Sequence, residues 1–575
     1  MKIKKLIPIL EWLPNYNKSQ FKGDFVAGLT IGIILIPQGI AYALIAGLPP
    51  IYGLYCALVP QIVYAIFGSS RQVAIGPVAM DSLIVATGVS TLALAGSQSY
   101  IAIAILLAFV VGSIQLLMGV FRLGFIVNFL SKPLITGFTS AVALIIGLNQ
   151  LRNILGVNFD QSDQIQIVVK DIFSKILNFD VQTTIIGISA ILIIVLLRKV
   201  SNKIPSALIV IILGIVVLRF FGNQFSTVSI IKDIPSGLPS FSFPELEFGQ
   251  IKELLPIAFT LVMVGYLETI SIGKTLEAKQ DEYKVRPNQE LIALGLSNIF
   301  GSFFKAYPST SSFSRSAINE EAGAKTGMSA LISVFMVAFT LLFLMPLFYH
   351  LPKTVLGAII IVAVFRLINI KEGKFLWKSN KLDFWLMITT FLSTLFFGIE
   401  YGIIIGVGVS LVVLIFRTSK PYVVELGKVP NSNFYRNKER FKEVILDDEV
   451  LVFRFDAQLF YANANYFRDK LEQMADAKGT ALKLIVLDGE SINRIDSTGI
   501  EMLKEQIKYY KKRNVLFFFA GIKGPVRDDL FRSGILDIID VNHFFMRAYH
   551  AVKYHKTGDR NHQQKYANYI HQAYH

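Results

Sequence analysis

Long apolar blocks follow one another from about residue 23 to residue 417. An α-helix needs about 20 mostly apolar residues to cross a lipid bilayer. Blocks of this kind predict membrane spans at Phe25–Ala46, Ile51–Phe67, Ile101–Val120, Pro133–Leu148, Thr183–Leu197, Ser206–Phe221, Leu254–Ile272, Gln289–Phe303, Gly327–Phe348, Thr354–Ile370, Leu382–Gly398 and Gly402–Phe416.

Two more apolar blocks, Pro77–Val89 and Pro308–Asn319, are too short or too broken to span a bilayer alone. With them the chain has fourteen elements, seven before Gly222 and seven after Gln250. The pattern therefore predicts an α-helical polytopic membrane protein with 14 transmembrane elements in two halves, at about 23–221 and 251–417.

After Arg417 the apolar blocks end and ordinary globular sequence begins. Between residues 448 and 549 we expect strands at Glu449–Asp456, Leu482–Leu487 and Val515–Ala520, and helices at Ala464–Met474 and Thr498–Lys511. The second helix carries one apolar face, formed by Ile500, Leu503, Ile507 and Tyr510. This alternation predicts a small α/β domain.

The chain is therefore expected to divide into five parts. They are a cytoplasmic N-terminal segment (1–22), a membrane domain (23–420), a linker (421–447), the α/β domain (448–555) and a disordered polar tail (556–575).

The net charge of +15 changes this picture little. On a soluble protein it would suggest nucleic acid, but membrane proteins collect Lys and Arg on cytoplasmic loops. The basic residues fall in alternate loops, at Arg71, Arg122, Lys132, Arg198, Lys199, Lys203, Lys279, Lys284, Arg286, Lys371, Lys374, Lys378 and Lys381. We therefore expect a multi-pass protein of the cell membrane, with its N-terminus and α/β domain in the cytoplasm and no nucleic-acid partner.

Cys56 is the only cysteine, and His350 is the only histidine of the membrane part. This composition excludes an intrachain disulfide and a cysteine or histidine metal cluster there. No cofactor is expected. The sequence also contains no nucleotide-binding loop and no catalytic triad, so an enzyme is not expected.

The two short blocks share one layout. Each has an extended polar stretch, then a proline, then a short helix, within residues 68–81 and 301–315. We expect Pro77 and Pro308 in the first helical turn, where the missing N–H costs nothing. Interrupted helices at matching places in two halves mark transporter binding sites. Helix starts carry about half a positive charge and bind anions, so we favour an anion site over ordinary proline kinks.

Arg315 is expected about two turns after the second break. An arginine at membrane depth costs at least about 2.5–3.5 kcal/mol, so it needs a reason to be there. We expect it to attract the bound anion, with a structural pair to a nearby carboxylate as the alternative. Ser311, Ser312 and Ser314 offer hydroxyl donors, although some of them suit a helix cap instead.

Two acidic residues are candidates for proton binding. Glu268 lies in an otherwise apolar helix, where burial lets a carboxyl group take up a proton near neutral pH. The alternative is a permanent ion pair with Arg315 or Lys274. Asp81 stands one turn into the first short helix, as a second titrating group, a cation ligand or a partner of the helix dipole.

A charge count favours a dianion. Two helix starts at about +0.5 each and Arg315 at +1 balance sulfate when Glu268 is protonated. Ionised Glu268 would spoil the balance, so proton and sulfate binding would be coupled at one site.

Several motifs resemble the SulP sulfate-permease family over nearly the full length. They are PQGIAYA (37–43), AGLPPIYGLY (46–55), GPVA (76–79), KPLITGF (132–138) and FSRSAIN (313–319). Within that family, LETISIGK (267–274) together with Ser314 and Arg315 resembles the sulfate-carrying branch most.

The resemblance implies a seven-plus-seven inverted repeat, a mobile core that moves like an elevator against a gate, and often a homodimer. It places Gln38 and Tyr42, four residues apart on one helix face, in the substrate pocket, where the alternative is polar packing between helices. It adds Val78, Ala79, Ser311 and Phe313 to that pocket, and it makes Glu268 the coupling carboxylate. Sodium-coupled bicarbonate relatives carry a hydroxyl one turn after the acid, where this chain has Ile272, which weakens a sodium hypothesis.

The α/β domain resembles the STAS domain, which follows the membrane part of SulP proteins and occurs in anti-sigma factor antagonists. The loop RIDSTG (494–499) carries this likeness. In the bacterial antagonists the matching serine is phosphorylated, so Ser497 is a candidate regulatory site. Asp496 and Ser497 would also cap the following helix well.

The leading hypothesis is thus a proton-coupled sulfate symporter. The alternatives are a carrier of bicarbonate, chloride or a dicarboxylate, a passive anion channel, and a nucleobase permease of similar architecture. Glu268 argues against a channel, which needs no proton site, and the second break with Arg315 argues against a nucleobase.

Overall fold

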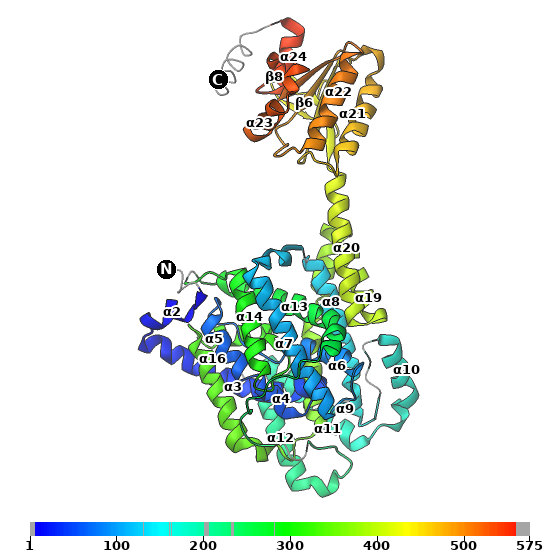
Figure 1. Cartoon of the computed structure of the whole chain (residues 1–575). Coiled ribbons are helices and arrows are strands. Elements are labelled where there is room, and N and C mark those ends of the chain that lie inside the picture. Colours follow the sequence, from blue (N-terminus) through cyan, green and yellow to red (C-terminus); the bar gives the residue numbers. More distant parts are fainter. Residues whose placement is uncertain are drawn as a thin grey trace. The chain divides into compact units, whose positions relative to one another are not determined.

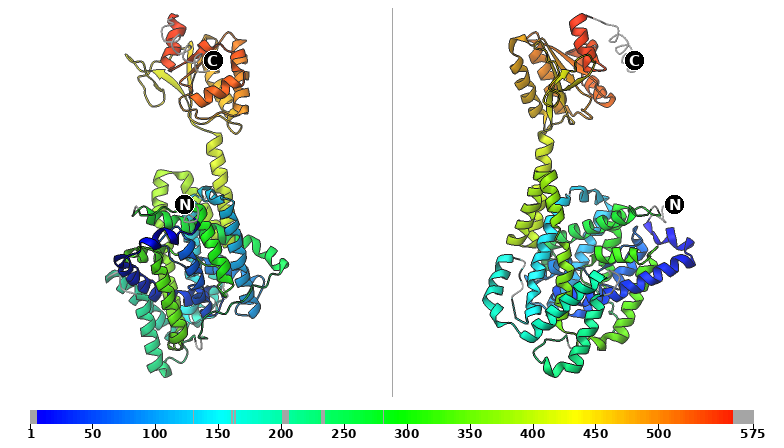
Figure 2. Two further views of the ribbon diagram at one scale, coloured as in Figure 1. Left: turned by 60° about the vertical axis from the view of Figure 1, so that its left-hand side comes forward. Right: turned by 180° about the vertical axis from the view of Figure 1, so that it is seen from behind.

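The structure is a computed structural model that describes residues 6–129, 131–159, 162, 164–200, 206–231, 235–280 and 282–558. The chain forms two compact units, Met1–Ser410 and Leu411–His575. The first unit is a bundle of helices, coloured blue to yellow-green, and the second unit contains a sheet with helices around it (Figures 1 and 2).

Helices make up nearly all of the first unit. In the first half they are α2 (Ile9–Trp12), α3 (Lys18–Ile45), α4 (Pro50–Tyr55), α5 (Val59–Phe67), α6 (Ala79–Ser90), α7 (Gln98–Val120), α8 (Lys132–Asn149), α9 (Leu151–Leu155), α10 (Ile165–Lys175), α11 (Val181–Val200) and α12 (Ser206–Phe221). In the second half they are α13 (Phe248–Glu277), α14 (Pro287–Ser302), α15 (Phe313–Glu321), α16 (Met328–Phe339), α17 (Lys353–Val364), α18 (Ile370–Ser379), α19 (Lys381–Phe397) and α20 (Ile399–Ser419).

Nine helical stretches in the described ranges are long and apolar enough to cross a membrane, and α6 and α12 are shorter apolar helices. Two of the expected spans lie within such stretches, Pro50–Phe67 and Lys353–Ser379, but each contains a break in its α-helix. The block at Ile51–Phe67 is broken into α4 and α5, because Pro60 fits only the first turn of a helix. In the block at Thr354–Ile370, α17 stops at Val364 and is followed by a 3₁₀ turn at Phe365–Leu367 before α18 begins. The fourteen-element count and the inverted repeat stay predictions.

Glycines let several helices of the first unit touch backbone to backbone. A Cβ on Gly53 of α4 would lie 1.9 Å from the carbonyl oxygen of Gly39 in α3. A Cβ on Gly295 of α14 would lie 2.5 Å from the backbone nitrogen of Leu116 in α7. Only glycine fits such crossings, so these positions set the spacing of helices around the site.

The second unit is built on a six-stranded sheet in the order β4-β3-β5-β6-β7-β8. The strands are β3 (Val423–Lys428), β4 (Tyr435–Asn437), β5 (Val450–Phe455), β6 (Leu484–Asp488), β7 (Leu516–Ala520) and β8 (Phe544–Phe545). Neighbours from β5 to β8 are parallel, whereas β3 pairs antiparallel with both β4 and β5. The helices are α21 (Ala464–Lys478), α22 (Ser497–Lys511), α23 (Gly524–Arg532) and α24 (Ala548–Thr557).

Each face of this sheet covers its own apolar core. In β5, Leu451 and Phe453 enter one core while Val450 and Val452 enter the other, as the two-residue period of a strand requires. The segment 421–447 differs from the expected linker, because its Val424 and Leu426 are buried in the second core. Residues 559–575 of the expected tail lie outside the described residues.

Candidate functional site

The two interrupted segments pair with one another. Strand β1 (Ile75–Gly76) runs antiparallel to β2 (Thr310–Ser311), with Ile75 opposite Ser311. The ladder is extended by Ser312, whose N–H donates to the Ala74 carbonyl over 3.1 Å. Because α6 follows β1 and α15 follows β2, the two helix starts lie at opposite ends of this short ladder.

Neither proline lies inside the helix that follows it, so the expected first-turn position is wrong for both. Helix α6 begins at Ala79 after its N-cap Val78, and Pro77 precedes that cap. Helix α15 begins at Phe313, well after Pro308. The reason is tertiary: the backbone of each break stays extended to pair with the other break, so helix can begin only beyond the ladder.

Arg315 is fully buried next to this ladder. It is the third residue of α15, in the first turn and not two turns after the break, and Ser312 Oγ accepts its N–H over 3.4 Å. Its Nη1 donates to Gln38 Oε1 over 3.2 Å and to the Pro77 carbonyl over 2.9 Å. Nε and Nη2 have no partner among the described residues. Two guanidinium donors therefore remain for an anion.

Gly76 lies next to this side chain in a backbone conformation that favours glycine. Its φ is +150°, and a Cβ there would lie 3.4 Å from Nη2 of Arg315. That distance is an ordinary van der Waals contact, so it is the backbone conformation, which L side chains rarely adopt, that favours glycine beside the guanidinium.

Two carboxylates lie near Arg315 without pairing with it directly. The charges of Asp81 in α6 and Glu268 in α13 interact with the charge of Arg315 and with each other. Asp81 Oδ1 and Glu268 Oε2 have no hydrogen-bond partner in the described part of the chain. Lys274 pairs instead with Glu277 over 2.7 Å. The structure therefore favours a free carboxyl group at Glu268 over a permanent ion pair.

Glu268 also borders a hollow of about 300 Å³. The other lining residues come from α6, α8, α13 and α20 and are mostly apolar: Met80, Leu134, Ile135, Phe138, Thr139, Met263, Val264, Leu267 and Ile403. Glu268 thus lies between the charged site and an apolar gap where two groups of helices face one another.

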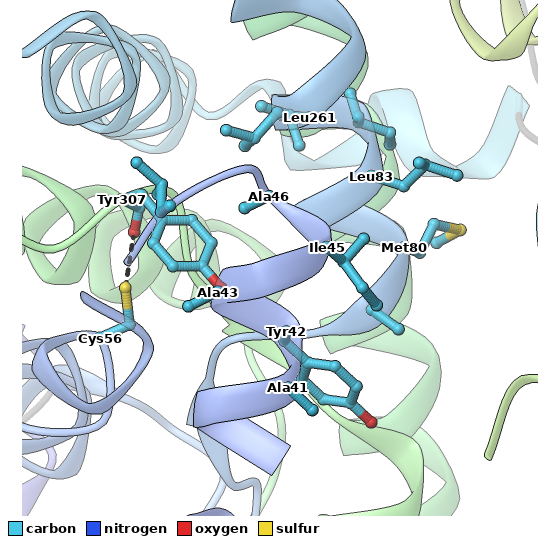
Figure 3. Close-up of a cluster of buried hydrophobic side chains, with 14 of the residues drawn as sticks. Ala41, Tyr42, Ala43, Ile45, Ala46, Cys56, Met80, Leu83, Leu261 and Tyr307 are labelled. Carbon is cyan, nitrogen blue, oxygen red and sulfur yellow. Dashed lines mark hydrogen bonds between the residues drawn. The ribbon is translucent and has the colours of Figure 1, made fainter. Parts of the chain in front are cut away.

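The structure brings most of the other expected site residues to the same region. Tyr42 is buried one turn after Gln38 on the same helix. Figure 3 shows Tyr42 on the helix that carries Ile45, with Met80 and Leu83 of α6 beside it. Helices α3 and α6 are in contact and together form one wall of the site.

The residues around the helix starts differ in exposure. Val78 is partly exposed and Ala79 is buried. Phe313 is 45% exposed and Ser314 is exposed, so both are open to a substrate. Ser311 is buried, and its hydroxyl lies 2.8 Å from Thr269 Oγ1, so its hydroxyl packs against α13.

Several supporting contacts at the site were not predicted from the sequence. Tyr307 and Ser82 share a hydrogen bond of 2.9 Å, and the thiol of Cys56 donates to the Tyr307 carbonyl over 3.2 Å (Figure 3). The sequence did contain a hint of this hydrogen bond, because a polar side chain stands next to a key residue in each break: Tyr307 precedes Pro308, and Ser82 follows Asp81.

Another buried carboxylate has a structural role. Glu290 of α14 accepts hydrogen bonds from the Tyr64 hydroxyl at 2.6 Å, the Ser69 N–H at 2.8 Å and the Ser70 N–H at 3.1 Å. These bonds hold the polar stretch before β1 in place. Glu290 therefore shows what a fully satisfied buried carboxylate looks like in this protein, in contrast to Asp81 and Glu268.

In the second unit, Ser497 is exposed as the first residue of α22. Asp496 is the N-cap: its carboxylate accepts the Gly499 N–H over 2.8 Å and the Tyr461 N–H over 2.9 Å. Asp496 rather than Ser497 therefore caps α22. Phosphorylation of Ser497 stays a prediction. Across the described ranges, no group of three or more His, Cys, Asp or Glu could hold a metal ion.

Comparisons with known proteins agree with this architecture. Residues 21–390 match the sulfate permease family, and residues 442–551 match the STAS domain. The chain is 39% identical to Sulfate transporter 4.1, chloroplastic, of Arabidopsis thaliana, over 96% of this chain and 82% of that protein. It is 33% identical to High affinity sulfate transporter 2 of Stylosanthes hamata, over 96% and 86%.

Solved structures give the same result. The murine Solute Carrier 26 family member A9 anion transporter in its inward-facing state is similar with a TM-score of 0.89 and 28% identity, over 96% of this chain and 94% of that one. The transmembrane domain of the cyanobacterium bicarbonate transporter BicA shares the fold, with a TM-score of 0.59 and 21% identity over 69% of this chain and 98% of that one.

The family expected from the motifs is confirmed, and its members are transporters rather than enzymes. The chain belongs to the sulfate permease family and is a helical membrane transporter with a STAS domain after its membrane part.

Proposed function

We propose that this protein is a secondary active transporter that carries sulfate together with protons. The observation that carries the proposal is the fully buried Arg315, which has two donors without a protein partner and lies near two helix starts. A buried charge of this kind is costly unless a ligand or a partner compensates it. The relatives named as sulfate transporters support sulfate as that ligand.

The site suits a tetrahedral dianion. Arg315 offers two donors, and the starts of α6 and α15 offer backbone N–H groups and about half a positive charge each. Gln38 and Tyr42 add an amide and a phenol on the α3 side. Val78, Ala79, Phe313 and Ser314 line the approach at the helix starts. Bicarbonate and chloride carry one charge and would leave part of this positive charge unbalanced.

Glu268 is the proposed proton-coupling group. Its ionised form would repel sulfate from Arg315, because like charges in a poorly solvated site oppose each other strongly. Protonation removes that repulsion, so the proton and the anion favour each other's binding. The absence of a direct ion pair among the described residues leaves this carboxyl group free to titrate.

We also propose that the elements of the site move together as a core. Gln38, Asp81, Glu268 and Arg315 come from four helices that share the contacts described above. Across the hollow beside Glu268, α8 and α20 present apolar side chains. Apolar contact is non-directional, so such a surface can slide without breaking hydrogen bonds. The basic residues of alternate loops place the N-terminus and the STAS domain on the cytoplasmic side of the cell membrane in this proposal. From the family resemblance we also propose that the protein forms homodimers.

Glu268→Gln tests the proposal. Glutamine imitates the protonated acid but releases no proton, so sulfate should still bind, with an affinity that no longer depends on pH. Sulfate exchange in proteoliposomes should survive, whereas uptake driven by an inward proton gradient should fail. The matched control is Glu277→Gln on the same helix, whose carboxylate pairs with Lys274. A mutant that still accumulates sulfate when only pH drives it would refute the role of Glu268, and a channel would show little change in conductance.

A further inference from the structure

Among the described residues, Asp81 is an acidic group that interacts with Arg315 and has no role in the proposed function. It is the third residue of α6 and is 2% exposed. Its charge interacts with those of Arg315 and Glu268, and Oδ1 has no hydrogen-bond partner in the described part of the chain. Glu290, equally buried, is held by several donors, so the environment of Asp81 differs from that of a structural carboxylate.

The groups around Asp81 come from every neighbouring element. Helix α6 packs against α3, α7, α8 and α13. Among the titratable or charged groups of these elements and the second break, Glu268, Tyr307 and Arg315 interact electrostatically with Asp81, and Tyr42, Tyr100 and Lys132 lie on the neighbouring helices. Tyr100 donates to the Ala46 carbonyl, and Lys132 pairs with Glu372 over 2.8 Å. Arg315 is thus the cation that faces both Asp81 and Glu268.

Two other roles for Asp81 fit the structure less well. Asp81 lies in the first turn of α6, where the helix dipole favours a negative charge, but it makes no capping bond at the helix start and its Oδ1 has no hydrogen-bond partner in the described part of the chain, so the dipole alone compensates the buried charge only partly. A bound cation would lie close to the guanidinium of Arg315 and be repelled by it. An unpaired buried charge is costly, so Asp81 is expected to take up a proton when its negative charge is not compensated.

Counting both acids changes the charge balance of the site. Arg315 and two helix starts supply about +2. With both carboxylates ionised and no anion, the sum is about zero. With sulfate bound and both carboxylates protonated, the sum is again about zero. With a single titrating acid, the empty site would keep about one positive charge.

We propose that Asp81 is a second proton-binding site and that two protons accompany each sulfate, so that transport moves no net charge. This inference rests on the proposed sulfate–proton symport. A carrier must move its site across the membrane both loaded and empty, and a neutral site crosses a poorly solvated barrier at the lowest cost. Sulfate with fewer than two protons leaves the site charged, and so do two protons without sulfate. Because a charged site crosses the barrier poorly, sulfate and protons have to move together.

The wild-type protein in proteoliposomes tests the number of protons directly. At zero membrane potential and a pH difference of one unit, two coupled protons support about 100-fold sulfate accumulation at static head and one proton about 10-fold, since each proton contributes a factor of ten. With two protons, an inside-negative potential set by potassium and valinomycin should leave the accumulation unchanged. A wild-type ratio of one would overturn the inference and leave the symport standing, whereas no pH-driven uptake would refute the proposed function itself.

Asp81→Asn tests the residue. The variant should bind sulfate, accumulate it about 10-fold per pH unit, and lose about 50-fold of that accumulation when 100 mV, inside negative, opposes one net negative charge. Asp81→Glu should restore the wild-type ratio. The control Thr87→Ala on the same helix removes only a hydrogen bond to the Ile84 carbonyl and should keep two protons per sulfate. A variant Asp81→Asn that keeps the ratio of two, or that folds but binds no sulfate, would overturn the assignment.

Discussion

Arg315→Ala is the most direct test of the sulfate site. The substitution removes a buried positive charge beside the two breaks, together with two donors, Nε and Nη2, that have no partner among the described residues. It also leaves Gln38 Oε1 and the Pro77 carbonyl without their donor. We expect the protein to fold, because the substitution also removes the cost of a buried charge.

The size of the effect follows from the donors. A hydrogen bond to a charged group contributes about 1.5–3 kcal/mol, so two such bonds to sulfate contribute about 3–6 kcal/mol. The affinity of Arg315→Ala should therefore fall by about 10² to 10⁴-fold. Arg315→Lys keeps the charge but loses the planar fork of donors, so it should recover only part of the loss.

Sulfate-dependent thermal stabilisation of the purified protein in detergent measures this loss. At a sulfate concentration of 100 times the wild-type Kd, binding stabilises the fold by about 2.7 kcal/mol. A 100-fold weaker variant keeps less than about 0.5 kcal/mol of that stabilisation at the same concentration. The control Arg71→Ala removes a basic residue that pairs with Glu282 over 3.7 Å and should keep the full stabilisation. Unchanged stabilisation in Arg315→Ala would refute the site.

Three further predictions concern other parts of the chain. Deletion of residues 421–575 should leave sulfate-dependent thermal stabilisation intact, because every proposed binding group lies in the first unit; a folded truncation that binds no sulfate would contradict this. Burial raises the pKa of Asp488 to about 6, so its charge costs stability above that pH and nothing below about pH 4. Asp488→Asn should therefore stabilise the isolated STAS domain against urea at pH 7.5 by up to about 3 kcal/mol, and equal midpoints at that pH would contradict the reasoning. Gly53→Ala should lower thermal stability by about 1–3 kcal/mol because its Cβ would meet the Gly39 carbonyl; Gly408→Ala, with open space at its Cβ, is the control, and equal losses would argue against the crossing.

Local pattern predicted the individual elements well. The block Ser206–Phe221 has the same bounds as α12, and the expected strand at Leu482–Leu487 lies within two residues of β6. The face of Ile500, Leu503, Ile507 and Tyr510 packs against one apolar core of the second unit. A membrane helix or a buried strand depends chiefly on its own apolar residues, so sequence order carries this information.

Details at the two breaks depended on residues far away in the chain. The motifs indicated that Pro77 and Pro308 interrupt their helices, but the position of each helix start follows from the pairing of β1 with β2. The same pairing puts Arg315 in the first turn of α15 and brings the Pro77 carbonyl to its Nη1. No pattern within one segment contains the register between two segments.

The sequence by itself determined that this chain is a membrane protein that resembles the sulfate permease family, with two interrupted helices and with one arginine and two acids as candidate site residues in its apolar part. Only the tertiary structure decided that Arg315, Asp81 and Glu268, from three different helices, interact with one another without a direct ion pair. The physical reason is that electrostatic coupling depends on distance and on the surrounding dielectric. Both are set by how helices pack, at glycine crossings and across the paired breaks, and not by the order of residues along the chain.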